Sequence, residues 1–220
     1  MGYRGEQNAA TAVPRRLRLL LPAVELAEAA SLGHVNITLS SDRVARRTPL
    51  AIPLGDGAFL PAVSVVAAHR VLGTAPGDLV LRPGSSVGIG SRVVTTDAAG
   101  QVLLNQYGGP GTIRTVSLGA LLAGEVASGS ITGRAVFIGA GAESLRDMFA
   151  TPYAADVMGV EVLATLAANL IDDSLIRSGG ALWFLTLALA LGAVVLVGLA
   201  VAVPSPPLLA AVVTLAVWTM

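Results

Sequence analysis

Three arginines follow an aspartate in one short polar stretch, and together they could bind an anion. The stretch contains Asp42, Arg43, Arg46 and Arg47. A guanidinium group binds carboxylates and phosphates through two parallel hydrogen bonds, so several in one place favour an anion site. Arg46 and Arg47 are therefore candidate ligand-binding residues. The alternative is that the cluster forms an ordinary solvated surface.

Two further polar segments contain residues that could contact a small molecule. The glycine-rich stretch NQYGGPG begins at Asn105, and Tyr107 lies within it. Asp147 precedes Thr151 and Pro152 in a polar break between apolar segments. Asn105, Tyr107 and Asp147 are candidate ligand-binding residues. Turn formation and capping of backbone N–H groups are the alternatives, because these residue types serve both purposes.

Several classes of site find no support in the sequence. The chain has no cysteine, and its two histidines, His34 and His69, are far apart, so we expect no metal site. The motif Gly139-Ala140-Gly141 is typical of a dinucleotide-binding turn, but Ser144 occupies the third glycine position. We interpret it as a tight connection, and we expect no cofactor. The net charge of zero gives no support to nucleic-acid binding.

Alternating apolar and polar segments predict a folded domain over residues 1–177. Helices are expected at 23–31, 60–72 and 159–171, with shorter ones at 117–122 and 143–149. Strands are expected at 34–39, 79–81, 87–95, 101–105 and 134–138, and 44–54 could pair with 34–39. The 134–138 run, RAVFI, has the composition of a buried strand.

The helix at 159–171 is predicted to bury one apolar face. Its members recur at helical spacing and are Val160, Leu163, Ala164, Ala167, Leu170 and Ile171. Residues 172–180 then separate this helix from an uncharged segment. A connection of that length could pass a displacement of the domain to the segment that follows.

The last charged residue is Arg177, and the sequence beyond it has the apolar composition of a membrane segment. Residues 181–203 carry no charge, and as a helix they would be roughly 35 Å long, enough to cross a hydrocarbon core of about 30 Å. We therefore predict a transmembrane helix at 181–203. Prolines at 204, 206 and 207 would break this helix. We predict that 208–220 is the start of a second transmembrane helix. The basic stretch ending at Arg18 is followed by only three apolar residues before Pro22, so we expect no export signal in this N-terminal stretch.

The order of several motifs resembles the CHASE type two family, the extracytoplasmic sensory domains of bacterial cyclases and kinases. The likeness covers most of the chain. The segments that carry it are Leu21-Pro22, Glu25-Leu26, Ala29-Ala30, Gly33 to Asn36, Asp42 to Arg47, Pro49-Leu50, Leu60-Pro61, Leu104-Asn105, Tyr107 to Gly111, Val136 to Ala140, Asp147 to Pro152 and Gly159 to Glu161. Leu163 and Thr165 stand where the family usually has His and Asn, and Arg43 replaces a usual glycine.

The resemblance implies an α/β fold, with a mixed-sheet extracytoplasmic sensory domain followed by transmembrane α-helices. It also implies that Thr151, Pro152, Gly159 and Glu161 are motif residues. Such a chain would be no enzyme itself. It would work as a homodimer in the inner membrane, with several membrane passes, and relay a small-molecule stimulus to a cyclase or kinase output domain outside this chain. Family members normally extend further at both ends, so the domain is expected to be N-terminally incomplete.

A cytoplasmic small-molecule-binding domain or enzyme, tethered by C-terminal membrane helices, is the competing hypothesis. It draws on the missing export signal and on the glycine turn at Gly139. The distribution of positive charge does not decide between the two, because only Arg177 lies next to the first apolar segment.

Overall fold

The structure is a computed structural model, and it describes residues 3–4, 22–55, 58–82, 84–141, 147–177, 180–202, 211, 214–215 and 218. The chain divides into two compact units, Met1–Arg177 and Ser178–Met220. Each unit is described by itself.

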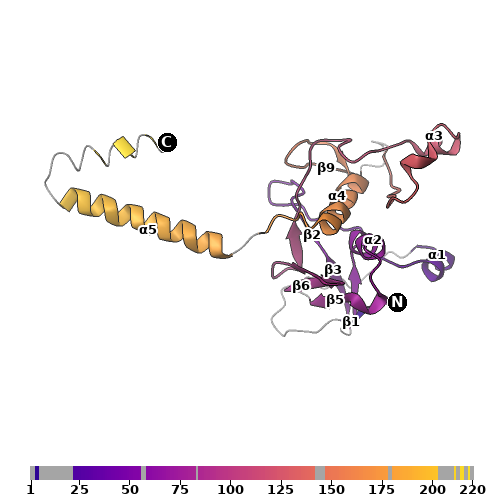
Figure 1. Ribbon diagram of the computed structural model, residues 1–220, viewed down its shortest axis with the longest axis horizontal. Helices are drawn as coiled ribbons and strands as arrows, with labels where there is room; N and C mark the ends of the chain where they lie inside the picture. The colour runs from indigo at the N-terminus through magenta and orange to yellow at the C-terminus, as the bar shows by residue number, and fades with distance from the viewer. Residues whose placement is uncertain are drawn as a thin grey trace. The chain divides into compact units, whose positions relative to one another are not determined.

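The first unit combines small antiparallel sheets with a few helices (Figure 1). One three-stranded sheet has the order β1 (Tyr3–Arg4), β4 (Ala58–Pro61), β3 (Ala51–Gly55), and the other has the order β5 (Leu79–Arg82), β6 (Ser86–Ile89), β7 (Arg92–Thr95). Two strand pairs are also described, β2 (Arg47–Pro49) with β8 (Gln101–Leu103), and β9 (Met148–Phe149) with β10 (Val157–Met158). The α/β class is confirmed. The predicted mixed sheet is not found among the described strands, whose parallel contacts are isolated bridges such as His34 with Ala62.

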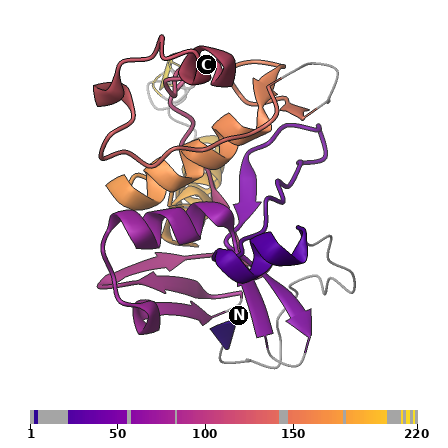
Figure 2. The same ribbon diagram turned by 90° about the vertical axis from the view of Figure 1, so that its right-hand side faces the viewer.

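Two helices, α2 (Val63–Val71) and α4 (Gly159–Asp172), lie side by side over the sheets (Figure 2). The buried Ser64 hydroxyl of α2 donates to the carbonyl of Leu163 in α4 at 2.6 Å. Val65 of α2 and Leu166 of α4 are both fully buried in one apolar core that also includes residues of β5 and β6. The other helical segments described in this unit are α1 (Val24–Ala29), α3 (Leu118–Leu122) and the 3₁₀ turns η1 (Pro76–Asp78) and η2 (Ser128–Ser130).

Most of the predicted elements are confirmed. The helices expected at 23–31, 60–72 and 159–171 correspond to α1, α2 and α4, although residues 60–61 belong to β4. The strands expected at 79–81 and 101–105 correspond to β5 and β8. Ser117 begins α3 as predicted, because its hydroxyl accepts the N–H of Gly119 at 3.2 Å.

Three strand predictions in the first half of the chain were wrong. Residues 87–95 form two strands and not one, because Gly90, with φ of +61°, turns the chain between β6 and β7. Residues 34–39 form only isolated bridges, and the expected partner at 44–54 is divided between β2, which pairs with β8, and β3, which pairs with β4. Proline at both 49 and 53 interrupts a continuous ladder there.

The segment 134–138 was predicted to be a buried strand, and it is neither buried nor a strand. Val136 is 52% exposed and Ile138 is 76% exposed. The helix predicted at 143–149 lies partly outside the described residues, and its last two residues form β9.

The predicted face of α4 was only partly right. Leu163, Ala167 and Leu170 are buried as expected, but the centre of the buried face is Val162 and Leu166. The face is therefore rotated from the apolar stripe, and it includes three polar residues.

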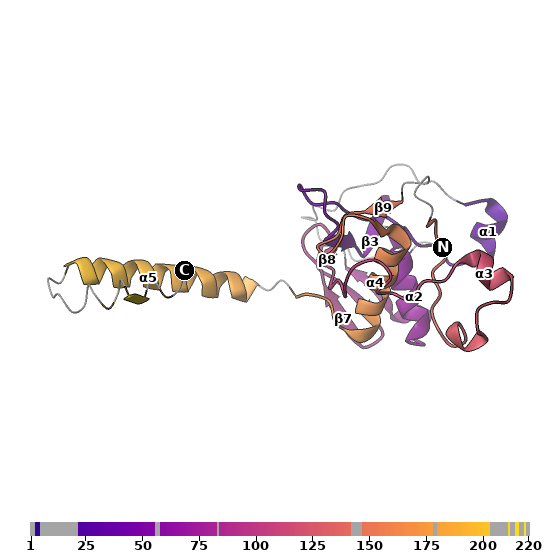
Figure 3. The same cartoon turned by 90° about the horizontal axis from the view of Figure 1, so that it is seen from above.

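The second unit contains α5 (Gly180–Ala202), which is drawn as one continuous helix (Figure 3). This is the helix expected at 181–203. The side chains described in it are those of residues 184–199, and all of these residues are exposed. In the part of the chain that the structure describes, no helix combines the length and apolar character needed to cross a membrane. Of the second helix predicted at 208–220, only residues 211, 214–215 and 218 are described.

Candidate functional site

A buried polar stripe runs along α4. Glu161, Thr165 and Asn169 are spaced four residues apart, so they share one face of the helix. Glu161 is 4% exposed and Asn169 is fully buried. Thr165 donates its hydroxyl proton to the carbonyl of Glu161 at 2.9 Å, within its own helix. Burial of polar groups costs free energy unless they are hydrogen-bonded, so the partners of the other two residues decide what the stripe does.

Glu161 holds the end of the glycine-rich loop. Its two carboxylate oxygens accept the backbone N–H groups of Gly111 and Ile113, each at 3.2 Å. Backbone donors are a suitable partner for a buried carboxylate, because a hydrogen bond with one charged partner is stronger than one between neutral groups. The motif residue Glu161 thus fixes residues 111–113 against α4.

Asn169 holds the start of the same loop. Its side-chain oxygen accepts the N–H of Asn105 at 2.9 Å, and its side-chain NH₂ donates to the carbonyl of Asn105 at 3.1 Å. The same NH₂ lies 3.4 Å from the Ser174 hydroxyl, which also pairs with the Tyr107 hydroxyl at 2.9 Å. The structure therefore brings the candidates Asn105 and Tyr107 together at the C-terminal end of α4. There the backbone of Asn105 and the hydroxyl of Tyr107 make contacts within the domain.

The C-terminal end of α4 has a second support, which the sequence did not reveal. The guanidinium of Arg92, from β7, donates to the carbonyls of Leu170, at 2.9 Å, and of Ile171. These are carbonyls of the last helical turn, where a positive charge also interacts favourably with the helix dipole. A single arginine in a predicted strand carries no signal for this role. Two separate segments, β7 and residues 105–107, thus make contact at the C-terminal end of α4.

Asp147 lies against the N-terminal end of α4. Its carbonyl accepts the N–H of Gly159 at 2.8 Å, and a Cβ at position 159 would approach its carboxylate oxygens to 2.6 Å. Glycine is therefore required at position 159, because the Asp147 carboxylate leaves no room for a side chain there. A carboxylate at this place also interacts favourably with the positive end of the helix dipole. The two predicted residues Asp147 and Gly159 thus meet in space.

Thr151 and Pro152 form a turn. The Thr151 hydroxyl accepts the N–H groups of Tyr153 and Ala154, at 3.4 and 3.3 Å, and the residue is buried. Pro152 is exposed. The carbonyl of Ala150 accepts the N–H of Ala45 at 2.7 Å, which links this turn to the segment before β2.

Arg46 and Arg47 pair with different carboxylates. Arg46 donates to both oxygens of Asp42 at 2.7 Å, and Arg47 contacts Asp97 at 3.1 Å. The hydrogen bond from Arg46, followed by one from the N–H of Val44, holds the pKa of the Asp42 carboxyl below its usual value. Each guanidinium is thus already paired with a carboxylate of the domain, so an external anion would compete with Asp42 and Asp97 for them.

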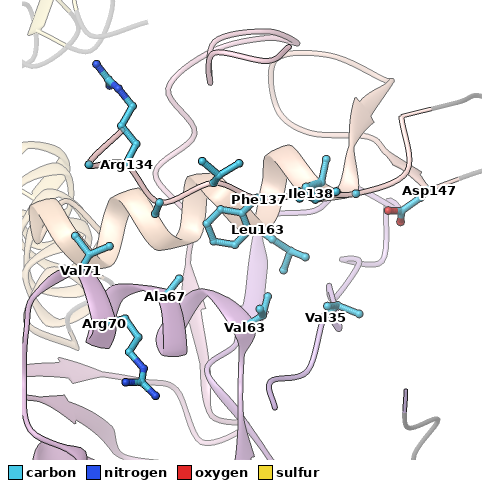
Figure 4. A pocket seen from close by; sticks show the side chains of 15 residues that line it. Val35, Val63, Ala67, Arg70, Val71, Arg134, Phe137, Ile138, Asp147 and Leu163 are labelled. Atoms are coloured by element: carbon cyan, nitrogen blue, oxygen red, sulfur yellow. The ribbon is translucent and has the colours of Figure 1, made fainter. Parts of the chain in front are cut away.

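Two cavities flank the segment 134–139, which lines both of them. One, of about 700 Å³, lies between this segment, α2 and α4. Its walls are mainly apolar, and Figure 4 shows the Phe137 ring between α4 and α2, with the guanidiniums of Arg70 and Arg134 pointing outward. The other, of about 670 Å³, lies between this segment, residues 113–121 and α4.

Of the predicted site residues, two line these cavities: Asp147 the first and Glu161 the second. The sequence prediction missed Phe137 and Val160, which line both, because apolar residues in a strand-like run favour a buried core. Among the described residues, no three acidic, histidine or cysteine side chains are grouped so that they could hold a metal ion.

Comparison with protein families decides what kind of domain this is. The model of the CHASE2 domain matches residues 4–203, which is most of the chain. The chain belongs to the CHASE2 domain family. CHASE2 domains are extracellular sensory domains, and they are not catalytic themselves, so membership supports a sensor role. The family resemblance inferred from the motifs is thereby confirmed. No curated protein and no solved structure shows significant similarity to the chain.

Proposed function

We propose that the chain is the sensory part of a membrane receptor, and that α4 carries the signal. The domain would lie outside the cytoplasm, respond to a small-molecule stimulus and relay it to a cyclase or kinase domain beyond this chain. Membership in the CHASE2 family supports the sensor role, since its domains are typically extracytoplasmic parts of membrane sensors. The relay itself is our proposal.

The contacts of α4 are the observation that carries this proposal. Glu161 near one end of the helix holds residues 111–113, while Asn169 and Arg92 fasten the other end. The chain leaves that end through Ser174 and Ile176, and Ile176 bridges Leu103 of β8. A change in the loop 105–113 would thus act on both ends of α4, and through it on residues 172–177.

The stimulus would shift the domain between two arrangements of this loop. In the arrangement described here, the Glu161 carboxylate is satisfied by two backbone donors. A small molecule that supplied its own hydrogen-bond donors from the adjoining cavity would compete with Gly111 and Ile113 and release the loop. Such a ligand changes the equilibrium only by its difference in affinity for the two arrangements.

The membrane arrangement draws on the sequence. Residues 181–203 carry no charge over 23 positions, and about 20 apolar residues are needed to cross a bilayer as a helix. We propose that this segment spans the membrane, that the segment from 208 begins a second pass, and that two copies associate, as in similar sensors.

Selective labelling of a single cysteine tests the location of the domain. The chain has no cysteine, so Ser128→Cys, at an exposed position of η2, provides one unique thiol. Intact bacterial cells that express the chain with its native upstream sequence are treated with a maleimide that does not cross the inner membrane. We expect Ser128→Cys to be labelled as completely as in lysed cells.

Labelling of Ser128→Cys only after lysis would overturn the sensor proposal. It would favour the competing hypothesis of a cytoplasmic binding domain or enzyme attached to the membrane. The same protein with Ser128 unchanged serves as the control for background labelling.

A further inference from the structure

The segment Arg134–Ile138 has the sequence of a buried strand but lies exposed. Val136 and Ile138 are 52% and 76% exposed, while Phe137 is half-buried against α4 and α2. The other four residues of the segment are all exposed, so within it only the Phe137 side chain is partly covered by the domain. A run of this composition would be buried if a neighbouring strand covered it.

The backbone of this segment is also unpaired. The groups of Ala135, Val136, Phe137 and Ile138 form no hydrogen bond with any other residue that the structure describes. Exposed apolar side chains with unpaired backbone groups are the features that make a segment a template for pairing with another chain. The two cavities, of about 700 and 670 Å³, leave space on both of its sides.

The charges at its two ends point to the partner. Arg134 lies at one end of the segment, and Asp147 lies beyond Ile138 at the other end (Figure 4). Neither side chain has an ion-pair partner within the described part of the chain. A two-fold axis would place each arginine of one copy at the aspartate end of the other, so the surface is complementary to itself.

We propose that residues 134–138 pair with the same residues of a second copy as antiparallel strands centred on Val136. Arg134 then lies opposite Ile138 of the second copy and near its Asp147. The Phe137 side chain of each copy then faces its own α2 and α4 helices, and the two Val136 side chains pack against each other across the pair. This proposal rests on the proposed function, and it assigns the dimer interface of that sensor to one face of the domain.

Cysteine cross-linking of the full chain in membranes tests the pairing. At the centre of an antiparallel pair, the two copies of Val136 lie opposite each other with Cβ atoms about 4.5–5.5 Å apart, within reach of a disulfide or a short bifunctional maleimide. We expect Val136→Cys to give a cross-linked dimer under mild oxidation. The control is Val93→Cys, because Val93 is 65% exposed on the edge strand β7 and should stay monomeric.

Charge reversal tests the orientation without relying on the cysteine. Arg134→Asp and Asp147→Arg alone should each raise the dissociation constant of the dimer about tenfold or more, because each variant creates two like-charged pairs across the interface. Analytical ultracentrifugation in detergent measures this constant. The double variant should restore the dimer. Loss of folding would be recognised from the far-ultraviolet circular dichroism, and the restored double variant keeps the proposal testable if one single variant is poorly folded.

Three results would overturn the proposal. The first is a cross-link at 93 and none at 136. The second is a thiol at 136 that maleimide does not reach and that forms no cross-link, which would mean that another part of the same chain, or a different partner, covers the surface. The third is a double variant no better than the single ones. The labelling at Ser128 is independent of all three, so this surface and the sensor role can fail separately.

Discussion

Arg43 has a left-handed backbone conformation, with φ of +64°, in the turn between Ser40 and Val44. A bulky residue pays about 1–2 kcal/mol for this conformation, because its Cβ comes too close to the carbonyl oxygen. Asp173, with φ of +51°, is the other described non-glycine residue in this region, and aspartate tolerates it better. The turn is nevertheless kept, because the Arg43 N–H donates to Ser40 and the Asp42 carboxylate accepts the Val44 N–H.

Replacing Arg43 by glycine should stabilise the domain. Relief of the strain exceeds the added entropy of the unfolded chain, so we expect the free energy of unfolding to rise by about 0.5–1 kcal/mol and the melting temperature by about 1–4 °C. Thermal and urea unfolding of the full chain measure both. Arg43→Ala removes the same charge but keeps the strain. An equal gain from Arg43→Ala would show that the charge, and not the backbone, is responsible.

At the scale of elements, local patterns predicted the helices well and the pairing of strands poorly. The spacing of apolar residues located α4 to within one residue. The same pattern misplaced its buried face, because Glu161 and Asn169 read as solvent-facing residues until their partners are known. Those partners are backbone groups 48 to 64 residues away in the chain, and no local pattern encodes them.

The segment 134–138 shows the opposite error. Its composition predicted burial, yet burial depends on a neighbour that the sequence pattern does not name, and Val136 lies exposed. Among the candidate ligand residues, Asn105 and Tyr107 were correctly placed in one loop, but their role as contacts to α4 and Ser174 required the fold.

Arg92 is the side chain on which the C-terminal end of α4 should depend most. It is half-buried and donates to two helix carbonyls, so Arg92→Ala should lower the free energy of unfolding by about 1–3 kcal/mol. The matched control is Arg114→Ala, which removes an exposed arginine bonded to Ser130 and should cost well under 1 kcal/mol. Urea denaturation measures both. Equal costs would contradict the assigned role of Arg92.

At the scale of the whole molecule, α4 links the loop 105–113 to the chain that leads out of the domain. Its 14 residues span about 21 Å. Glu161 lies at the first turn, and Asn169 lies near the last turn, where Ser174 and Arg92 also make contact. The central claim is that a change at Glu161 reaches residues 169–177.

Hydrogen exchange of the full chain in detergent micelles measures this coupling directly. Glu161→Gln replaces one acceptor oxygen by an NH₂ group, so at least one of the bonds to Gly111 and Ile113 is lost. The control is Glu125→Gln, the same change at an exposed position. We predict faster exchange in Glu161→Gln at residues 111–113 and also at 169–177, with β6 unchanged, and no change in the control. Faster exchange confined to 111–113, or spread equally over the whole domain including β6, would contradict the account.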